Sequence, residues 1–181
     1  MKIRRVVAGT GVDGKSKVIV DGIAPRSVEF TSMPGYAAAL LWSTEPSEGI
    51  SADANLVDRT GEVGFVPPEG GSRLVMVTIP PDSVMTRADV DLAAFGSEAV
   101  RLLPGLADKF EPDHLGMHKT DSIDYDVVLE GEVTVEFDDG KEVLLHKHDV
   151  LVQHGNRHAW RNRTEQPATV LFVLLGARRP G

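Results

Sequence analysis

The stretch from residue 127 to residue 152 alternates apolar and polar residues between turn-forming residues. Apolar side chains recur at every second position in 127–129, 133–137, 143–145 and 150–152. The pair Asp139–Gly140 interrupts this pattern in its middle. Alternation bounded by turn residues is typical of short antiparallel strands, and Asp-Gly is a strong hairpin signal. The stretch therefore predicts a compact β-barrel or β-sandwich.

The histidines of the chain are concentrated in this same region. All six lie between residues 114 and 162, at His114, His118, His146, His148, His154 and His158. Imidazole is both a common metal ligand and a common acid–base group. The predicted barrel is therefore also the predicted place of the chemistry.

Composition limits the classes of protein that this chain can belong to. Its 181 residues, 41% of them hydrophobic, suit one domain with a proper core. Cysteine is absent, which excludes disulfides, thiolate metal sites and cysteine nucleophiles. A net charge of −8 disfavours nucleic acid and anionic membranes as partners. Since Met1–Val7 does not resemble a signal peptide and no stretch reaches membrane-spanning length, we expect a cytoplasmic protein.

The first eighty residues predict additional strands. Asp13–Gly14 is the expected turn between the first two strands, and residues 44–61 are expected to form a surface loop. Residues 73–80 are apolar on both faces, which predicts a covered strand. The predicted strands are 3–8, 17–20, 28–31, 37–43 and 73–80.

Residues 81–113 predict a helical connector. Ser83 or Thr86 is expected to cap a helix that ends at Gly96, and a second helical turn is expected from Ser97 to Leu103. A connector of this length in a compact domain is usually functional or disordered. Two interpretations are open: a lid across the mouth of the barrel, or a surface excursion that covers an edge strand.

Two short motifs in residues 114–176 resemble those of the cupin superfamily. His118, Thr120, Asp124 and Gly131 follow the spacing of its first motif, GxxxxxHxHxxxExxxxxxG. Downstream, the segment from Gln153 through His158 to Asn162 is similar to its second motif, GxxxxxPxGxxHxxxN. The resemblance is to small single-domain proteins of the cupin 2 type. It implies an all-β fold, the cupin double-stranded β-helix or jelly-roll barrel, with extra N-terminal strands and the helical connector in one domain over 1–181.

The resemblance also implies a set of metal ligands, in which His118, Asp124 and His158 take the matching positions. Thr120 stands where the family has a second histidine, Asp124 replaces a glutamate, and His148 replaces a glycine. Two imidazoles and one carboxylate would resemble the set that holds non-haem Fe(II), and Mn, Ni or Zn are also chemically admissible. His114 is a candidate replacement ligand. The alternative is a metal-free pocket in which Asp124 and His158 transfer protons and His118 orients the substrate.

Other residues are candidates for substrate contact. Trp160 shares the strand parity of His158, so it is expected to form an apolar wall or simply part of the core. Asp126 shares the face of Asp124, Gln153 takes the proline position of the second motif, and Thr120 faces the same way as His118. Arg73 could attract a substrate carboxylate, although arginines near strand ends usually just interact with solvent at the protein surface.

Three functions are compatible with the sequence. The first is an enzyme of small-molecule metabolism, an oxidoreductase such as a dioxygenase or a lyase or isomerase, acting on a keto, enol or aromatic acid. The second is a non-catalytic module that binds or senses a small ligand. The third, a structural protein, has no sequence feature in its favour. The resemblance alone implies a homodimer, and no DNA-binding helical motif precedes the barrel.

Overall fold

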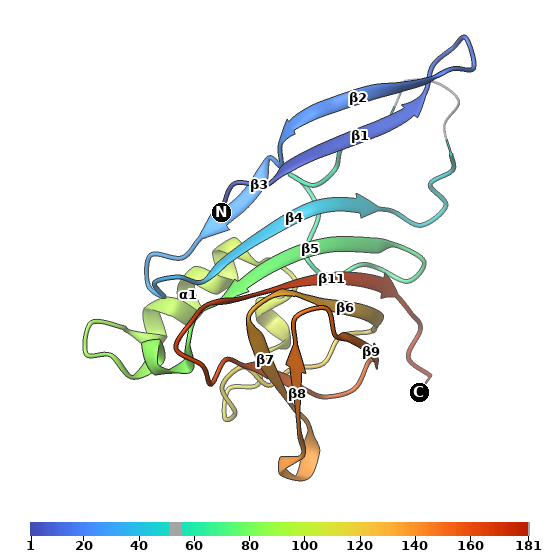
Figure 1. Cartoon of the computed structure of the whole chain (residues 1–181). Helices are drawn as coiled ribbons and strands as arrows, with labels where there is room; N and C mark the ends of the chain where they lie inside the picture. The colour runs from blue at the N-terminus through green and yellow to red at the C-terminus, as the bar shows by residue number, and fades with distance from the viewer. Residues whose placement is uncertain (51–55, 181) are drawn as a thin grey trace.

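The structure, a computed structural model, describes residues 1–50 and 56–180 (Figure 1). Within these ranges the chain forms eleven β-strands, one α-helix and short 3₁₀ turns at Asp82–Thr86, Ala107–Lys109 and Asp138–Gly140. The elements are β1 (Arg4–Thr10), β2 (Ser16–Ile23), β3 (Arg26–Glu29), β4 (Ala37–Thr44), β5 (Ser72–Ile79), α1 (Leu92–Leu102), β6 (Ser122–Glu130), β7 (Glu132–Glu136), β8 (Glu142–His146), β9 (Val150–His154), β10 (Ala159–Arg161) and β11 (Ala168–Gly176).

The strands form two facing antiparallel sheets and a separate hairpin. The larger sheet has six strands in the order β3-β4-β5-β11-β6-β9, and the smaller has three in the order β10-β7-β8. Apolar side chains from both sheets share one buried cluster, including Val128 of β6, Val135 of β7 and Val170 of β11. The predicted all-β jelly-roll class is confirmed. It follows from the period-two alternation, because each strand buries one face against the other sheet.

The predicted turns are present where the sequence places them. Asp139 and Gly140 both have positive φ, 58° and 69°, and they connect β7 to β8 with Glu136 opposite Glu142. Gly14 has φ 74° between β1 and β2. Aspartate and glycine tolerate this left-handed conformation better than other residues do. These turns therefore set the strand register that the alternation requires.

The N-terminal strands enter the fold in two ways. β3, β4 and β5 extend the six-stranded sheet, in which β5 pairs along its length with β11. β1 and β2 pair only with each other and project from the body (Figure 1). Arg5 holds the hairpin to the body through Leu41 O at 2.8 Å and lies over the Trp42 ring. The predicted loop over 44–61 includes residues 51–55, which lie outside the described residues.

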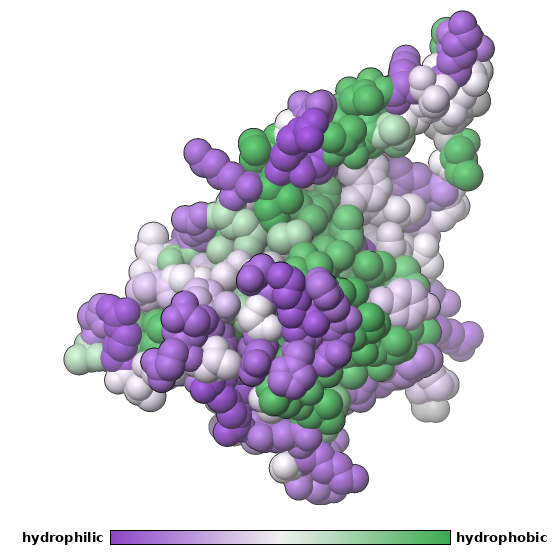
Figure 2. Space-filling view, viewed as in Figure 1, coloured by the Kyte–Doolittle hydropathy of each residue, from purple (hydrophilic) through white to green (hydrophobic). Residues whose placement is uncertain are grey.

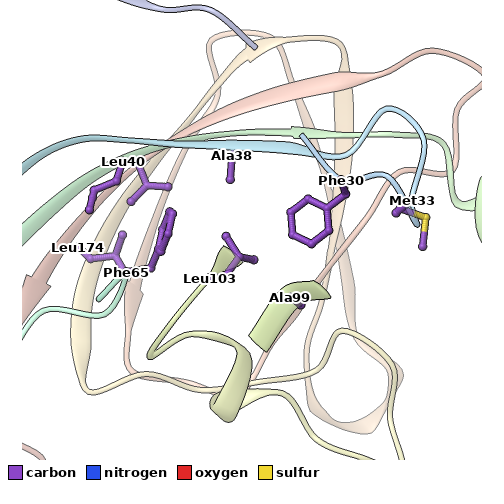
Figure 3. Close-up of a cluster of buried hydrophobic side chains, with 9 residues drawn as sticks. Phe30, Met33, Ala38, Leu40, Phe65, Ala99, Leu103 and Leu174 are labelled. Carbon is purple, nitrogen blue, oxygen red and sulfur yellow. The ribbon is translucent and has the colours of Figure 1, made fainter. Parts of the chain in front are cut away.

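The connector contains one helix where the sequence predicted two helical turns. Asp91, and neither Ser83 nor Thr86, caps α1 by accepting hydrogen bonds from the backbone N–H groups of Ala93 and Ala94. The helix continues through Gly96, so the predicted end at that residue is wrong. The physical reason is tertiary packing: Ala99 and Leu103 lie against the six-stranded sheet in one buried cluster (Figure 3), and this burial outweighs the weak helix propensity of glycine.

A buried carboxylate attaches α1 to the sheet. Glu98 is 9% exposed and accepts hydrogen bonds from the backbone N–H and hydroxyl groups of Thr31 and Ser32. Burial raises the pKa of Glu98, but the Ser32 and Thr31 hydrogen bonds outweigh it and lower the pKa to about 2. The turn between β3 and β4 thereby holds the helix in place. No helix within 1–50 or 56–180 is long and apolar enough to cross a bilayer.

The first prediction concerns this carboxylate. Because its folded-state pKa lies below the ordinary value of 4.5, its stabilisation is present above that pH and is lost as the pH falls toward about 2. Glu98→Gln should lower the free energy of unfolding by roughly 1–3 kcal/mol at pH 7. In urea titrations the difference from the wild type should narrow between pH 5 and pH 3. The exposed Glu165→Gln is the control, and a difference independent of pH would contradict the assignment.

A second prediction concerns Gly96. A Cβ built there meets nothing within 4 Å and the residue has a helical backbone. Gly96→Ala should therefore stabilise the protein by roughly 0.5–1 kcal/mol, because alanine loses less backbone entropy in a helix. At Gly105, with φ +82°, the same substitution should destabilise it. Thermal unfolding of the two variants measures both; equal shifts of one sign would contradict the prediction.

Apolar residues remain exposed on the hairpin and on the outer face of the larger sheet, where Figure 2 shows hydrophobic surface along and below the hairpin. Val18 of β2 is 60% exposed, and Val152 of β9 is 52% exposed. Exposed apolar patches commonly mark sites of association. The expected homodimer stays a prediction: light scattering should give twice the mass of one chain, and the mass of one chain at micromolar concentration would contradict it.

Candidate functional site

A cavity of about 260 Å³ lies between α1 and the inner face of the six-stranded sheet. Most of its lining is apolar. β5 and β11 contribute one wall, and α1 with its C-cap residue contributes another. The lining residues are Val75, Val77, Ile79, Phe172 and Leu174 on the strands, Leu92, Phe95 and Ala99 on the helix, and Leu103 at its C-cap. The connector therefore forms a wall of this cavity. Whether it opens and closes stays a prediction.

One end of the cavity is polar and contains most of the residues predicted from the sequence. His118, Thr120, Asp124, His158 and Trp160 all line it. His118 and His158 come from segments forty residues apart, and their backbones exchange two N–H···O hydrogen bonds of 2.9 Å. Their ring centroids are 4.4 Å apart. This backbone bridge is what brings the two histidine motifs together.

Both histidines are held in one ring orientation. His118 Nδ1 lies 3.0 Å from Gly116 O, and His158 Nδ1 lies 3.1 Å from Asn156 O. A carbonyl only accepts, so in each neutral ring Nδ1 carries the proton. Burial lowers the pKa of His118, and burial together with the nearby His118 lowers the pKa of His158 to about 4. At neutral pH both rings are therefore uncharged, with Nε2 as a hydrogen-bond acceptor.

Two carboxyl groups are buried beside the histidines. Asp124 is 5% exposed and its Oδ1 has no hydrogen-bond partner in the described part of the chain. Burial raises the pKa of Asp124, partly opposed by a hydrogen bond from Ser122. Burial and then the charge of Asp124 raise the pKa of Asp126 to about 8. Asp126 is thus protonated at neutral pH, while Asp124 is the stronger acid of the two.

A hydrogen-bonded chain connects Asp126 to the cavity. The Gln153 amide Nε2 donates to Asp126 Oδ2 at 2.9 Å and lies 3.2 Å from His158 Nε2. Gln153 and Asp126 do not themselves line the cavity. They are therefore not placed to contact a ligand directly, although the sequence predicts such contact. Instead, Asp126 orients the Gln153 amide, and Gln153 orients the His158 ring.

The three-ligand metal site stays a prediction. Although His118, Asp124 and His158 line the same cavity, no three His, Asp or Glu side chains within 1–50 and 56–180 form a metal-binding group. Thr120, at the position of the missing histidine, pairs with the Ser122 hydroxyl at 2.8 Å. His114, the candidate replacement ligand, does not join the other candidates, because its Nε2 pairs with Glu136 at 3.0 Å and its side chain is exposed.

The predicted substrate arginine lies elsewhere. Arg73 is buried outside the cavity lining, where it donates to Gly64 O and pairs with Glu45 at 2.9 Å. Its charge is paired with a carboxylate of the segment that precedes β5. Arg73 therefore holds that loop and does not meet a ligand in the cavity.

Several cavity residues were missed by the sequence analysis. Phe110 packs on His118 with ring centroids 4.8 Å apart, and Phe172 meets Trp160 edge-on at 5.2 Å. The α1 wall was missed because its apolar stripe, Phe95, Ala99 and Leu103, was divided at Gly96. The spacing of that stripe, four residues each time, was the available signal.

The remaining histidines have no part in the cavity. His146 and His154 are exposed strand-end residues. His148 is also exposed and has φ 76°, which explains why the cupin motif has a glycine at this position.

Comparison with known proteins agrees with this geometry. Residues 109–174 match the family model described as "Cupin domain". They are a cupin domain. In this cupin the matched residues include β6 to β10, most of β11 and both histidine motifs.

Curated relatives match about a third of the chain. A phomopsin biosynthesis cluster protein of Diaporthe leptostromiformis is 46% identical over 63 residues, 34% of this chain and 33% of that protein. A cupin-domain-containing oxidoreductase of Hypocrea virens is 35% identical over 65 residues, 34% of each. The matched segment thus spans about a third of the length of these relatives.

Among solved structures, the Schizosaccharomyces pombe Cnp3 cupin domain aligns with 97% of this chain and 89% of that chain. The identity is 12% and the TM-score is 0.48. This likeness is too low to support any functional argument.

Proposed function

We propose that this cupin is a small-molecule enzyme of the oxidoreductase or lyase type, with its active site at the polar end of the cavity. The observation that carries the proposal is Asp124, a buried carboxylate whose Oδ1 has no hydrogen-bond partner in the described residues and which lines an otherwise apolar cavity. A buried acceptor without a partner is destabilising and is usually explained by function. The names of the relatives called cupin-domain-containing oxidoreductases support the class.

The arrangement suits proton transfer at a carbon next to a carbonyl group. This step serves a lyase or isomerase directly, and an oxidoreductase would use it before the substrate gives up electrons to an oxidant such as molecular oxygen. Asp124 is the base, since burial raises its pKa and thereby strengthens the carboxylate as a proton acceptor. The Thr120 hydroxyl at the same end can donate a hydrogen bond to the substrate carbonyl oxygen, where negative charge develops. The neutral His118 Nε2, which has no partner within the described residues, can accept a hydrogen bond from a substrate hydroxyl group. Trp160 and Phe172 form the wall that excludes water from this end.

One observation favours a second candidate function. The ligands that the cupin motifs imply do not assemble into a metal-binding group in the described residues, although the cavity is intact. A ligand-binding or sensing module would keep such a cavity without catalysis. This alternative requires tight binding without any turnover.

The third prediction separates the two functions. The probe is a simple ketone, a 4-alkylacetophenone. If the protein transfers protons, the hydrogens of the acetyl methyl group, next to the carbonyl, should exchange for deuterium in D₂O, and NMR measures this exchange directly. Asp124→Asn should slow the exchange by about 10²–10⁴-fold, because a general base contributes that much. The binding constant should change by only a few-fold.

Asp121→Asn is the matched control. Asp121 is exposed and pairs with Arg179 away from the cavity, so its variant should exchange at the wild-type rate. Undiminished exchange in Asp124→Asn would refute the role of Asp124. Binding of the ketones with no exchange by the wild type would favour the binding module.

A further inference from the structure

The charged groups around the cavity do not suit the organic acid that the sequence predicts as a substrate. Arg161 is the cation among its described lining residues, and its charge is already paired: Nε lies 2.7 Å from Glu136, and Nη1 donates to Leu115 O at 2.8 Å. Arg157, close by in the chain, pairs with Glu111 and Asp138. A ligand carboxylate would therefore be buried beside Asp124, and the one cation of the described lining is already balanced by Glu136. Burial of an unpaired charge is strongly unfavourable.

The rest of the cavity is suited to apolar groups. The buried side chains of α1 face β5 and β11 across it, and Leu103 and Phe65 lie in its apolar part (Figure 3). Aromatic rings occur at both ends: Phe95 on the helix, and Trp160 with Phe172 near the histidines. Such walls favour rings and alkyl chains over sugars or other hydroxyl-rich compounds.

Most polar groups of the lining lie at one end. There His118 and Asp124 contribute acceptors, and Thr120 contributes a hydroxyl group that can donate to a ligand oxygen. Tyr36 adds one more hydroxyl group beside Phe95 on the helix side. A volume of about 260 Å³ is near the lower limit for small-molecule sites, roughly 300–1,000 Å³. The cavity reaches the surface at lining residues such as Leu92, which is 42% exposed.

We infer that the ligand of this cavity is a neutral, largely apolar molecule, a ring with an alkyl or second ring substituent, that carries a single carbonyl or hydroxyl group at the polar end. It is not a carboxylate. The inference rests on the proposed function for its catalytic meaning, but the identity of the ligand class can be tested by binding alone.

The test compares two matched series, 4-n-alkylacetophenones and 4-n-alkylbenzoates, with alkyl groups from methyl to hexyl. Calorimetry on the full chain measures the binding constants. Each added methylene should tighten ketone binding by about fourfold until the cavity is full. The benzoate of equal chain length should bind at least tenfold more weakly.

The second part of the test uses a variant in which a larger side chain fills part of the cavity. Gly96 lines the cavity beside open space, so Gly96→Leu should weaken binding of the hexyl ketone at least tenfold and of the methyl ketone much less. Ala94→Leu, an exposed position on the same helix outside the lining, should leave both unchanged.

The outcomes are distinct for the two proposals. Benzoates that bind as tightly as the ketones, affinity independent of chain length, or no binding of either series would overturn the inference. Ketone binding with the expected chain-length dependence but without deuterium exchange would retain the ligand class and refute the proposed enzyme.

Discussion

The antiparallel pairing of β11 with β5 on one side and β6 on the other joins the two halves of this protein. β11 is the last strand of the chain, yet it lies in the middle of the six-stranded sheet. Its register places Leu174 opposite Asp124 of β6 and Phe172 opposite Val75 of β5. The strand thus sets the polar residues of the cupin segment beside the apolar residues of the N-terminal segment. A cavity that is apolar along its length and polar at one end follows from this order of strands.

The polar end combines groups that are individually unfavourable to bury. Asp124 and Asp126 lie on the same face of β6, and each has a carboxyl oxygen without a partner in the described residues. Both histidines are neutral because burial lowers their pKa values. Proton acceptors in a largely apolar cavity are more useful for chemistry than for stability, since the same desolvation that destabilises them strengthens their interaction with a bound ligand. The fold tolerates this because Gln153 and the reciprocal His118–His158 backbone bonds hold the surrounding chain.

The helix α1 gives this cupin domain a wall that its matched segment does not contain. The match to the cupin family begins at residue 109, after the helix. Glu98 attaches α1 to the turn after β3, and its apolar stripe faces the sheet. The α1 residues that line the cavity are therefore outside the part of the chain that matches the cupin family model. Likeness within the cupin segment consequently says little about the ligand.

Much of the fold and the position of the site could be predicted from the sequence. Period-two alternation and Asp-Gly turns determine strands and hairpins locally, because they depend on neighbouring residues alone. The spacing of His118, Asp124 and His158 likewise determines that these side chains face the interior. Only the tertiary structure decided that α1 runs through Gly96, that Arg73 pairs with Glu45 away from the cavity, and that the predicted ligands do not form a metal-binding group in the described residues. Each of these depends on contacts between residues far apart in the chain, for which one sequence carries no local signal.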